Sequence, residues 1–251
     1  MSLDKLKELC IRNQDVEKLW HYSCPSKSFC ELETLILRDN NKLLSVISSS
    51  MIIRFNKLNF LTLGNCELLT EVFNLEDDQL DHNIQEMLPQ LRALALSNLS
   101  NLTCVWNKEP QVPFFTSLVS LFIVCCDRSP QVYSHLLQKN LGKLKSLKLC
   151  NCENIEEVIS SDKDESVPII FPEMEWLVLK DLPKLVSFCS QSATFDWPNL
   201  KTVRVNNIPS LKTFSKGNLN TPSLRSIPTI FAKKLWPGNL NETISYMHNN
   251  P

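Results

Sequence analysis

The chain has 251 residues, 43% of them hydrophobic, which is enough for one large domain or two small ones. Lys and Arg number 26 against 27 Asp and Glu, and this balance argues against a bulk electrostatic partner such as duplex DNA. No apolar run approaches the roughly 18 residues that a membrane-spanning helix needs, and the charged N-terminus lacks the apolar region of a secretory signal. The 10 cysteines are therefore expected to stay reduced, and the Asn-x-Ser/Thr triplets at Asn98, Asn101 and Asn241 are expected to be chance matches.

An apolar-x-x-apolar-x-apolar pattern recurs along the chain. In chain order it begins at Leu6, Leu32, Leu58, Leu91, Leu118, Leu144, Met174 and Leu200, with steps of 26, 26, 33, 27, 26, 30 and 26 residues. All 24 of its defining positions are apolar, and 19 of them are leucine. The alternation within each copy predicts a short strand with one buried face. Because so short a repeat cannot bury its apolar side alone, the copies are expected to stack into a continuous core beneath one parallel sheet.

Three further columns follow the same step. Bulky apolar residues lie three positions before most starts, at Phe29, Phe55, Leu88, Phe115, Leu141, Phe171 and Trp197, and are expected to fill the wider, convex side. Fourteen positions after the starts lie Trp20, Val46, Val72, Val105, Val132, Val158, Phe188 and Phe214. Eight positions after several starts lie Asn40, Cys66, Cys126 and Cys152. These Asn and Cys side chains are predicted to turn inward and hydrogen-bond the backbone where the strand bends away.

Two copies are long and one is irregular. The third carries seven extra residues around 74–87 and the sixth carries four around 160–167, and both insertions are acidic. Extra length in a solenoid emerges as loops away from the strand. Solvated loops and a docking surface for a basic partner domain are both open interpretations. The fifth copy departs from the template between Cys125 and Leu141.

The expected fold is of the α/β class: a leucine-rich-repeat solenoid, a curved horseshoe with a parallel sheet on the concave face and irregular loops and short helices on the convex side. Residues 1–230 are assigned to about eight to nine repeats, and residues 231–251 to a polar C-terminal tail. An ordinary leucine-rich α/β domain is the alternative, but it has no reason to keep a 26-residue step. Because Leu6, Leu9 and Ile11 would present an uncapped apolar edge, the chain is expected to be a fragment or a shortened gene product.

Several repeats resemble those of one protein family. The segments FPEMEWLVLKDLPKLVSFCS (Phe171–Ser190), WPNLKTVRVNNIPSLKTFSKG (Trp197–Gly217), LKSLKLCNCENIEEVI (Leu144–Ile159) and LNFLTLGNCELLTEVF (Leu58–Phe73) resemble repeats of plant coiled-coil, nucleotide-binding, leucine-rich-repeat (NB-ARC-LRR, or NLR) disease-resistance proteins. The ending LWPGNLNETI (Leu235–Ile244) is similar to the tail that follows them. The resemblance implies a cytoplasmic immune receptor whose repeats sense a pathogen effector or an altered host protein.

The sequence departs from that family in one respect. It holds four glycines, no P-loop and no coiled-coil or nucleotide-binding domain, so switching by nucleotide exchange does not carry over and no cofactor is expected. The implied partner is a protein: an effector, a guarded host protein or a nucleotide-binding switch domain. No nucleic acid or membrane partner is expected.

The exposed positions of the strands would line the concave sheet and bind this partner. In the C-terminal half they gather cations beside one tryptophan, and the central repeat adds an aromatic residue. The candidate binding residues are Lys145, Lys148, Trp176, Lys180, Lys201, Arg204 and Phe122. An aromatic beside cations is typical of a protein-binding hot spot, whereas ordinary solvated lysines are the competing interpretation.

Catalytic and metal sites find no support in the sequence. The four histidines lack the spacing of a metal motif, the cysteines form no C-x-x-C pair, and no G-x-S-x-G is present. Two other functions stay open: a substrate-recruiting scaffold such as a ubiquitin-ligase adaptor, and an enzyme with an unrecognised site.

Overall fold

The computed structural model describes residues 3–20, 25–75, 84–108, 110–128, 142–159, 169–192, 194–228, 234–236 and 238–250. The chain divides into two compact units, Met1–Phe122 and Ile123–Pro251, and strand β8 (Ser120–Val124) crosses the division. The two acidic insertions and the irregular part of the fifth repeat fall largely on residues 76–83, 160–168 and 129–141, which lie outside the described residues.

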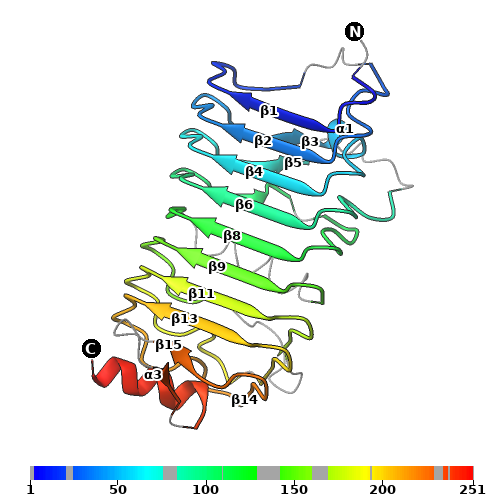
Figure 1. Ribbon diagram of the computed structural model, residues 1–251. Coiled ribbons are helices and arrows are strands. Elements are labelled where there is room, and N and C mark those ends of the chain that lie inside the picture. The colour runs from blue at the N-terminus through cyan, green and yellow to red at the C-terminus, as the bar shows by residue number, and fades with distance from the viewer. Residues whose placement is uncertain are drawn as a thin grey trace. The chain divides into compact units, whose positions relative to one another are not determined.

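Each unit is built on a ladder of parallel five-residue strands, one for each repeat. In the first unit β1 (Glu8–Arg12), β2 (Thr34–Arg38), β4 (Phe60–Gly64) and β6 (Ala93–Ser97) pair in that order. In the second unit β9 (Ser146–Cys150), β11 (Trp176–Lys180) and β13 (Thr202–Asn206) pair in the same way (Figure 1). Equivalent repeat positions lie opposite one another in every pair. The predicted leucine-rich-repeat solenoid is therefore confirmed.

A second layer of shorter parallel strands occurs in each unit where loops and short helices were expected. The first unit holds β3 (Ile47–Ser48), β5 (Glu71–Asn74) and β7 (Cys104–Trp106), with the four-residue helix α1 (Ser49–Ile52). The second unit holds β10 (Ile169–Ile170), β12 (Phe195–Asp196) and β14 (Leu219–Asn220), and an antiparallel pair, β15 (Ile227–Pro228) and β16 (Lys234–Leu235). The column fourteen positions after the starts passes through β5 and β7 at Val72 and Val105, but strands of two to four residues are too short for an alternating pattern to identify them.

The core of each unit lies between its two layers. The second and third apolar positions of the repeats are buried in every described copy after the first, whereas Leu9 and Ile11 on β1 are half-buried. The bulky column three positions before the starts is also buried, as expected: Phe29, Phe55 and Phe115 of the first unit are at most 4% exposed. In the second unit Trp197 lies among four phenylalanine rings. Burial of these columns drives the stacking of the repeats.

The residue that follows each long strand adopts a left-handed backbone conformation. These residues are Asn13, Asp39, Asn65, Asn98, Cys125, Asn151, Asp181 and Asn207, with φ between 51° and 59°. Asn and Asp tolerate this conformation better than other residues with a side chain. Their side chains also connect repeats, since Asn65 donates to Asp39 at 2.7 Å and Asn207 donates to Asp181 at 2.8 Å.

The Asn and Cys side chains eight positions after the starts turn inward and hydrogen-bond the backbone, as predicted. Asn40 is fully buried, and its amide group donates to the carbonyls of Ile11 and Arg38 while it accepts from the backbone N–H of Gln14. Cys66 and Cys152 each donate to the carbonyl two residues earlier, at 3.4 and 3.3 Å. The nine described cysteines form no disulfide.

Burial should protect these inward-facing thiols from alkylation. Burial raises the pKa of the Cys152 thiol to about 11, so at pH 8 about one molecule in a thousand carries the reactive thiolate. We expect iodoacetamide to label exposed Cys10 well before Cys152 in the native protein at pH 8, as measured by peptide mass spectrometry. Equal labelling rates for the two cysteines in the folded chain would contradict this structural role.

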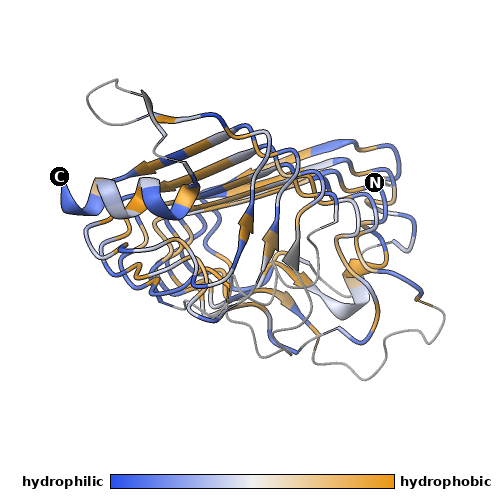
Figure 2. Cartoon of the chain, turned by 90° about the horizontal axis from the view of Figure 1, so that it is seen from below, coloured by the Kyte–Doolittle hydropathy of each residue, from blue (hydrophilic) through white to orange (hydrophobic). Residues whose placement is uncertain are grey.

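The C-terminal segment folds as a docked helix where a polar tail was expected. Helix α3 (Leu240–Asn249) begins at Asn239, whose side chain accepts from the N–H of Glu242 at 2.9 Å. Its residues Leu240, Thr243 and Ile244 are buried, and Figure 2 shows hydrophilic and hydrophobic residues together on this helix. The apolar positions are spaced three to four residues apart, so they form one buried stripe on an otherwise polar sequence.

The asparagines of the three Asn-x-Ser/Thr triplets are occupied by structural hydrogen bonds. The amide nitrogens of Asn98, Asn101 and Asn241 donate to other segments at 2.7, 2.8 and 2.9 Å. A glycan attached to any of these nitrogens would replace one of its two N–H donors.

Candidate functional site

The candidate site is the outer face of the long ladder in the second unit. In β9, β11 and β13 alternate residues are buried leucines and valines, so the intervening residues lie on the outer side of the strands; among them Cys150 is buried, at 4% exposed. In-register pairing arranges these residues in three rows that we call the face grid. Its rows are Ser146, Trp176 and Thr202; Lys148, Val178 and Arg204; and Cys150, Lys180 and Asn206.

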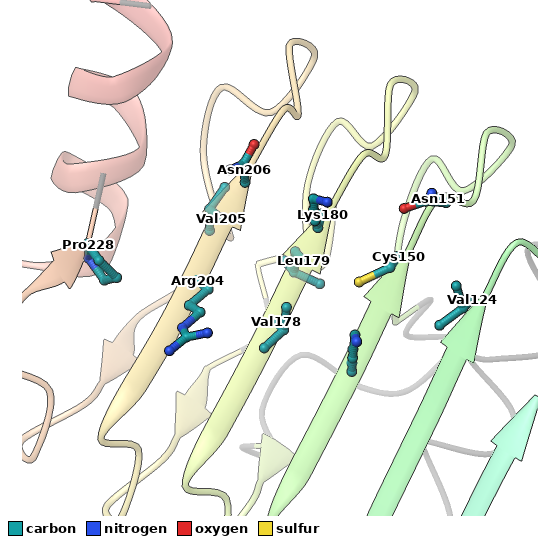
Figure 3. Close-up of a pocket in the computed structure, with 11 residues that line it drawn as sticks. Val124, Cys150, Asn151, Val178, Leu179, Lys180, Arg204, Val205, Asn206 and Pro228 are labelled. Carbon is teal, nitrogen blue, oxygen red and sulfur yellow. The ribbon is translucent and has the colours of Figure 1, made fainter. Parts of the chain in front are cut away.

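An open hollow of about 560 Å³ covers two rows of this grid. Its lining comprises Val124, Lys148, Cys150, Asn151, Val178, Leu179, Lys180, Arg204, Val205, Asn206 and Pro228. Figure 3 shows Arg204 on β13 between Val178 on β11 and Pro228 on β15. The floor of the hollow is therefore apolar, and its charged groups stand around that floor.

Three cations, Lys148, Lys180 and Arg204, form what we call the cation triangle. Lys148 and Arg204 are exposed and flank Val178, two strand spacings or roughly 10 Å apart. Within the described part of the chain neither has an ion-pair or hydrogen-bond partner. Lys180 lies 3.3 Å from the Asp181 carboxylate, at a side-chain exposure of about half.

Positive charges of the triangle act on the pKa values of two neighbouring groups, Asp181 and Cys150. The pKa of Asp181 is lowered, first by the hydrogen bond from Asn207 and then by Lys180. Burial raises the pKa of the Cys150 thiol, and the charges of Lys148 and Lys180 oppose that rise. Both ammonium groups are therefore close enough to Cys150 to act on it. Its raised pKa favours the protonated thiol, and Cys150 forms part of the wall of the hollow.

The described residues contain no cluster suited to a metal ion, since no three His, Cys, Asp or Glu side chains among them are grouped. No helix in the described part of the chain is long and apolar enough to cross a membrane.

Comparison with known proteins identifies the repeats. The family model for "Plant disease resistance protein RPS2-like, leucine-rich repeats" matches residues 5–153 and 112–216, which is more than half of the chain. The chain belongs to this family. It is also 32% identical over 121 residues to "Disease resistance protein UNI" of Arabidopsis thaliana, a match that covers 47% of this chain and 13% of that protein. No solved structure matches the chain.

These findings confirm the resemblance to leucine-rich repeats of plant disease-resistance proteins. A leucine-rich-repeat solenoid is a protein-interaction fold, and its sheet presents an extended surface to partners. The chain spans only about an eighth of the relative that it matches, so the activity of a whole resistance protein is not carried by this comparison.

The leucine-rich-repeat sheet brings together only part of the predicted site. Lys148, Lys180 and Arg204 line one hollow, and Trp176 stands on the same strand as Lys180 with 45% of its surface exposed. Phe122 is half-buried on β8 and belongs to the first unit.

Lys145 and Lys201 lie outside the face grid because each precedes its strand by one residue. Lys145 pairs with Glu173 at 3.4 Å, and Lys201 pairs with Glu175 at 2.8 Å. Both ammonium groups are therefore partly neutralised by carboxylates at the beginning of the strands. The grid row that begins each strand carries Ser146, Trp176 and Thr202 instead.

Other residues of the hollow were not among the predicted site residues. Val178, Cys150 and Asn206 occupy alternate positions of the same strands, so the period of two could have included them. Pro228 gave no signal, because β15 follows the last regular repeat and pairs antiparallel with β16.

Proposed function

We propose that this chain is the protein-recognition part of a plant immune receptor, and that the face grid contacts its protein ligand. The ligand would be a pathogen effector, a modified host protein or a nucleotide-binding switch domain of the receptor itself. The observation that carries the proposal is the exposure of Lys148 and Arg204, without a carboxylate partner among the described residues, beside the half-exposed Trp176.

The physical case rests on how protein interfaces obtain their affinity. Buried aromatic and arginine side chains contribute most of the binding energy in many interfaces. Trp176 presents a large apolar surface, and Arg204 presents a planar group that binds carboxylates with two hydrogen bonds. Leucines and valines fix the strands beneath them, so little conformational entropy is lost when a partner orders the face.

The family supplies the biological setting of the proposal. The relative named above is a disease-resistance protein, and this chain matches a small part of its length. In this setting the chain acts in the cytoplasm, binds and does not catalyse, and the cations select a partner with an acidic surface.

Charge reversal on the face tests the proposed function. We expect the variant Lys148→Glu with Arg204→Glu to lose at least about tenfold in partner capture, because it replaces attraction by repulsion at the centre of the contact. The matched control is Lys143→Glu with Lys216→Glu, which makes the same change of charge at exposed positions of the second unit outside the hollow.

The measurement is a pull-down from plant tissue, with and without pathogen infection, quantified by mass spectrometry. An immune receptor or its guarded host protein should be retained by the unmodified chain and by the control. Retention should also weaken as salt rises, since exposed charges are screened. Unchanged retention of every captured protein by a correctly folded charge-reversed variant would refute the proposed contact face.

A further inference from the structure

The three cations of the cation triangle are grouped more closely than the charges of a general basic surface. Lys148 and Arg204 occupy the same row of the grid, and Lys180 lies two residues further along the strand between them. Strand spacing of about 5 Å and a rise of about 3.3 Å per residue put the three Cα atoms roughly 8 to 10 Å from one another. Side chains of this length can converge above Val178 from three strands.

The surroundings of the triangle suit an anion that has an apolar stem. Val178 forms the centre of the floor, and Val124 and Pro228 stand at its sides. The amide groups of Asn151 and Asn206 lie on the rim as neutral hydrogen-bonding groups. An anionic side chain could therefore bury its carbon atoms on the floor while its charge meets the cations.

The number and position of the cations indicate how much negative charge a ligand of the hollow carries. Among the described residues, Lys180 is the one cation of the triangle with a carboxylate neighbour, and this neighbour, Asp181, is held on the turn by the hydrogen bond from Asn207. A single carboxylate would leave most of the positive charge unopposed. The first row of the grid carries no charge, so the basic residues do not continue as a track for a nucleic-acid backbone.

We infer that the hollow binds a side-chain group of a partner protein that carries about two negative charges, either a phosphorylated residue or a pair of adjacent carboxylates. Arg204 supplies two parallel hydrogen bonds to its oxygens, and Lys148 and Lys180 act as point charges on either side. This inference rests on the proposed function, because it names the chemistry that the face grid recognises.

Three peptides test this chemistry. They share flanking residues of alanine, glycine and serine, and their centres carry phosphothreonine, two adjacent glutamates or threonine. They are titrated into the isotopically labelled full chain and followed by NMR. We expect the phosphothreonine peptide to bind at least about tenfold more tightly than the threonine peptide and to shift the amide signals of Val178 and Lys180.

Three variants separate the contact from general charge effects. The charge-reversed pair Lys148→Glu and Arg204→Glu should abolish this preference, and the control pair Lys143→Glu and Lys216→Glu should keep it. Arg204→Lys keeps the charge but loses the planar group, so it should weaken phosphothreonine binding while leaving the fold intact by circular dichroism.

The outcomes distinguish the two anion sources and the two proposals. Preference for phosphothreonine, with loss of partner capture after phosphatase treatment of the extract, assigns the site to a phosphorylated residue. Equal or better binding of the glutamate peptide, with capture insensitive to phosphatase, assigns it to paired carboxylates. If neither anionic peptide binds more tightly than the threonine peptide, the inference is overturned. The proposed function would still stand if capture depended on Lys148 and Arg204.

Discussion

Replacing Trp197 by alanine should lower the free energy of unfolding by about 3–5 kcal/mol, because it leaves a large cavity in the core of the second unit. The indole is 1% exposed. Its ring centroid lies 5.1 Å from that of Phe171, 5.3 Å from that of Phe188 and 5.5 Å from that of Phe214. These rings come from several repeats, so one substitution removes packing that joins the stack.

Trp176→Ala is the matched control for this substitution. It removes the same side chain from an exposed position of the same unit, and surface substitutions of this kind usually change stability by about 0.5 kcal/mol or less. Guanidinium titrations followed by circular dichroism compare the two variants. Similar midpoints for Trp197→Ala and Trp176→Ala would show that the aromatic cluster does not stabilise the unit.

A smaller replacement adds a second check. The indole N–H of Trp197 has no hydrogen-bond partner among the described residues. Trp197→Phe removes this buried donor together with part of the ring, so the loss of packing is offset by relief of an unsatisfied polar group. We expect its effect on stability to be clearly smaller than that of Trp197→Ala.

The sequence predicted the layer of long strands and missed the layer of short strands. Leu147 and Leu149 recur at a fixed step, and their spacing of two forces a strand with one buried face. The strands β10 and β12 have two residues each, and nothing in so short a segment separates a strand from a loop.

One periodic signal was present but unused. Asn or Asp stands seven residues after the start of every copy except the fifth, which has Cys125. This column marks the left-handed turn that ends each strand, since Asn and Asp adopt that conformation at low cost. The position of such a turn fixes the last residue of the strand, and hence which residues reach the face grid.

The site was predicted as far as the strand register allowed. Lys148 and Arg204 share one repeat position, so the sequence places them in one row. Lys201 was included from a position that precedes the strand, although Glu175 holds the same repeat position in the neighbouring copy and the register could have indicated their ion pair. The enclosure of the hollow by Pro228 depends on how the chain turns after its last regular repeat, and that turn has no counterpart elsewhere in the sequence.

Asn241 closes the edge of the last repeat in the second unit, because its side chain makes hydrogen bonds like those that repeats make with each other. In the interior the N–H of Val158 donates to the carbonyl of Phe188, and the N–H of Phe188 donates to that of Phe214. The N–H of Phe214 has no further repeat to meet. It donates at 2.9 Å to the side-chain oxygen of Asn241, on the first turn of α3.

The same amide group completes the pattern at the neighbouring residue. Its oxygen also accepts from the N–H of Ser215 at 3.1 Å, and its nitrogen donates to the Ser215 carbonyl at 2.9 Å. A primary amide offers the donor and acceptor of a peptide group, so one side chain satisfies three backbone groups at the edge. Helix α3 is thereby fixed against the last repeat, where Leu240 and Ile244 are buried.

Replacing Asn241 by alanine should therefore destabilise the end of the second unit by about 2–4 kcal/mol, because several part-buried backbone groups lose their partners together. Hydrogen exchange measured by NMR should show faster exchange of the Phe214 and Ser215 amides, with the amides of β9 less affected. Asn249→Ala in the exposed last turn of the same helix is the control, and it should leave both rates unchanged. Retention of slow exchange at Phe214 in Asn241→Ala would mean that burial of Leu240 and Ile244 closes the stack without the amide. In that case apolar packing alone would stabilise the edge of the repeat, and its backbone groups would form hydrogen bonds with water.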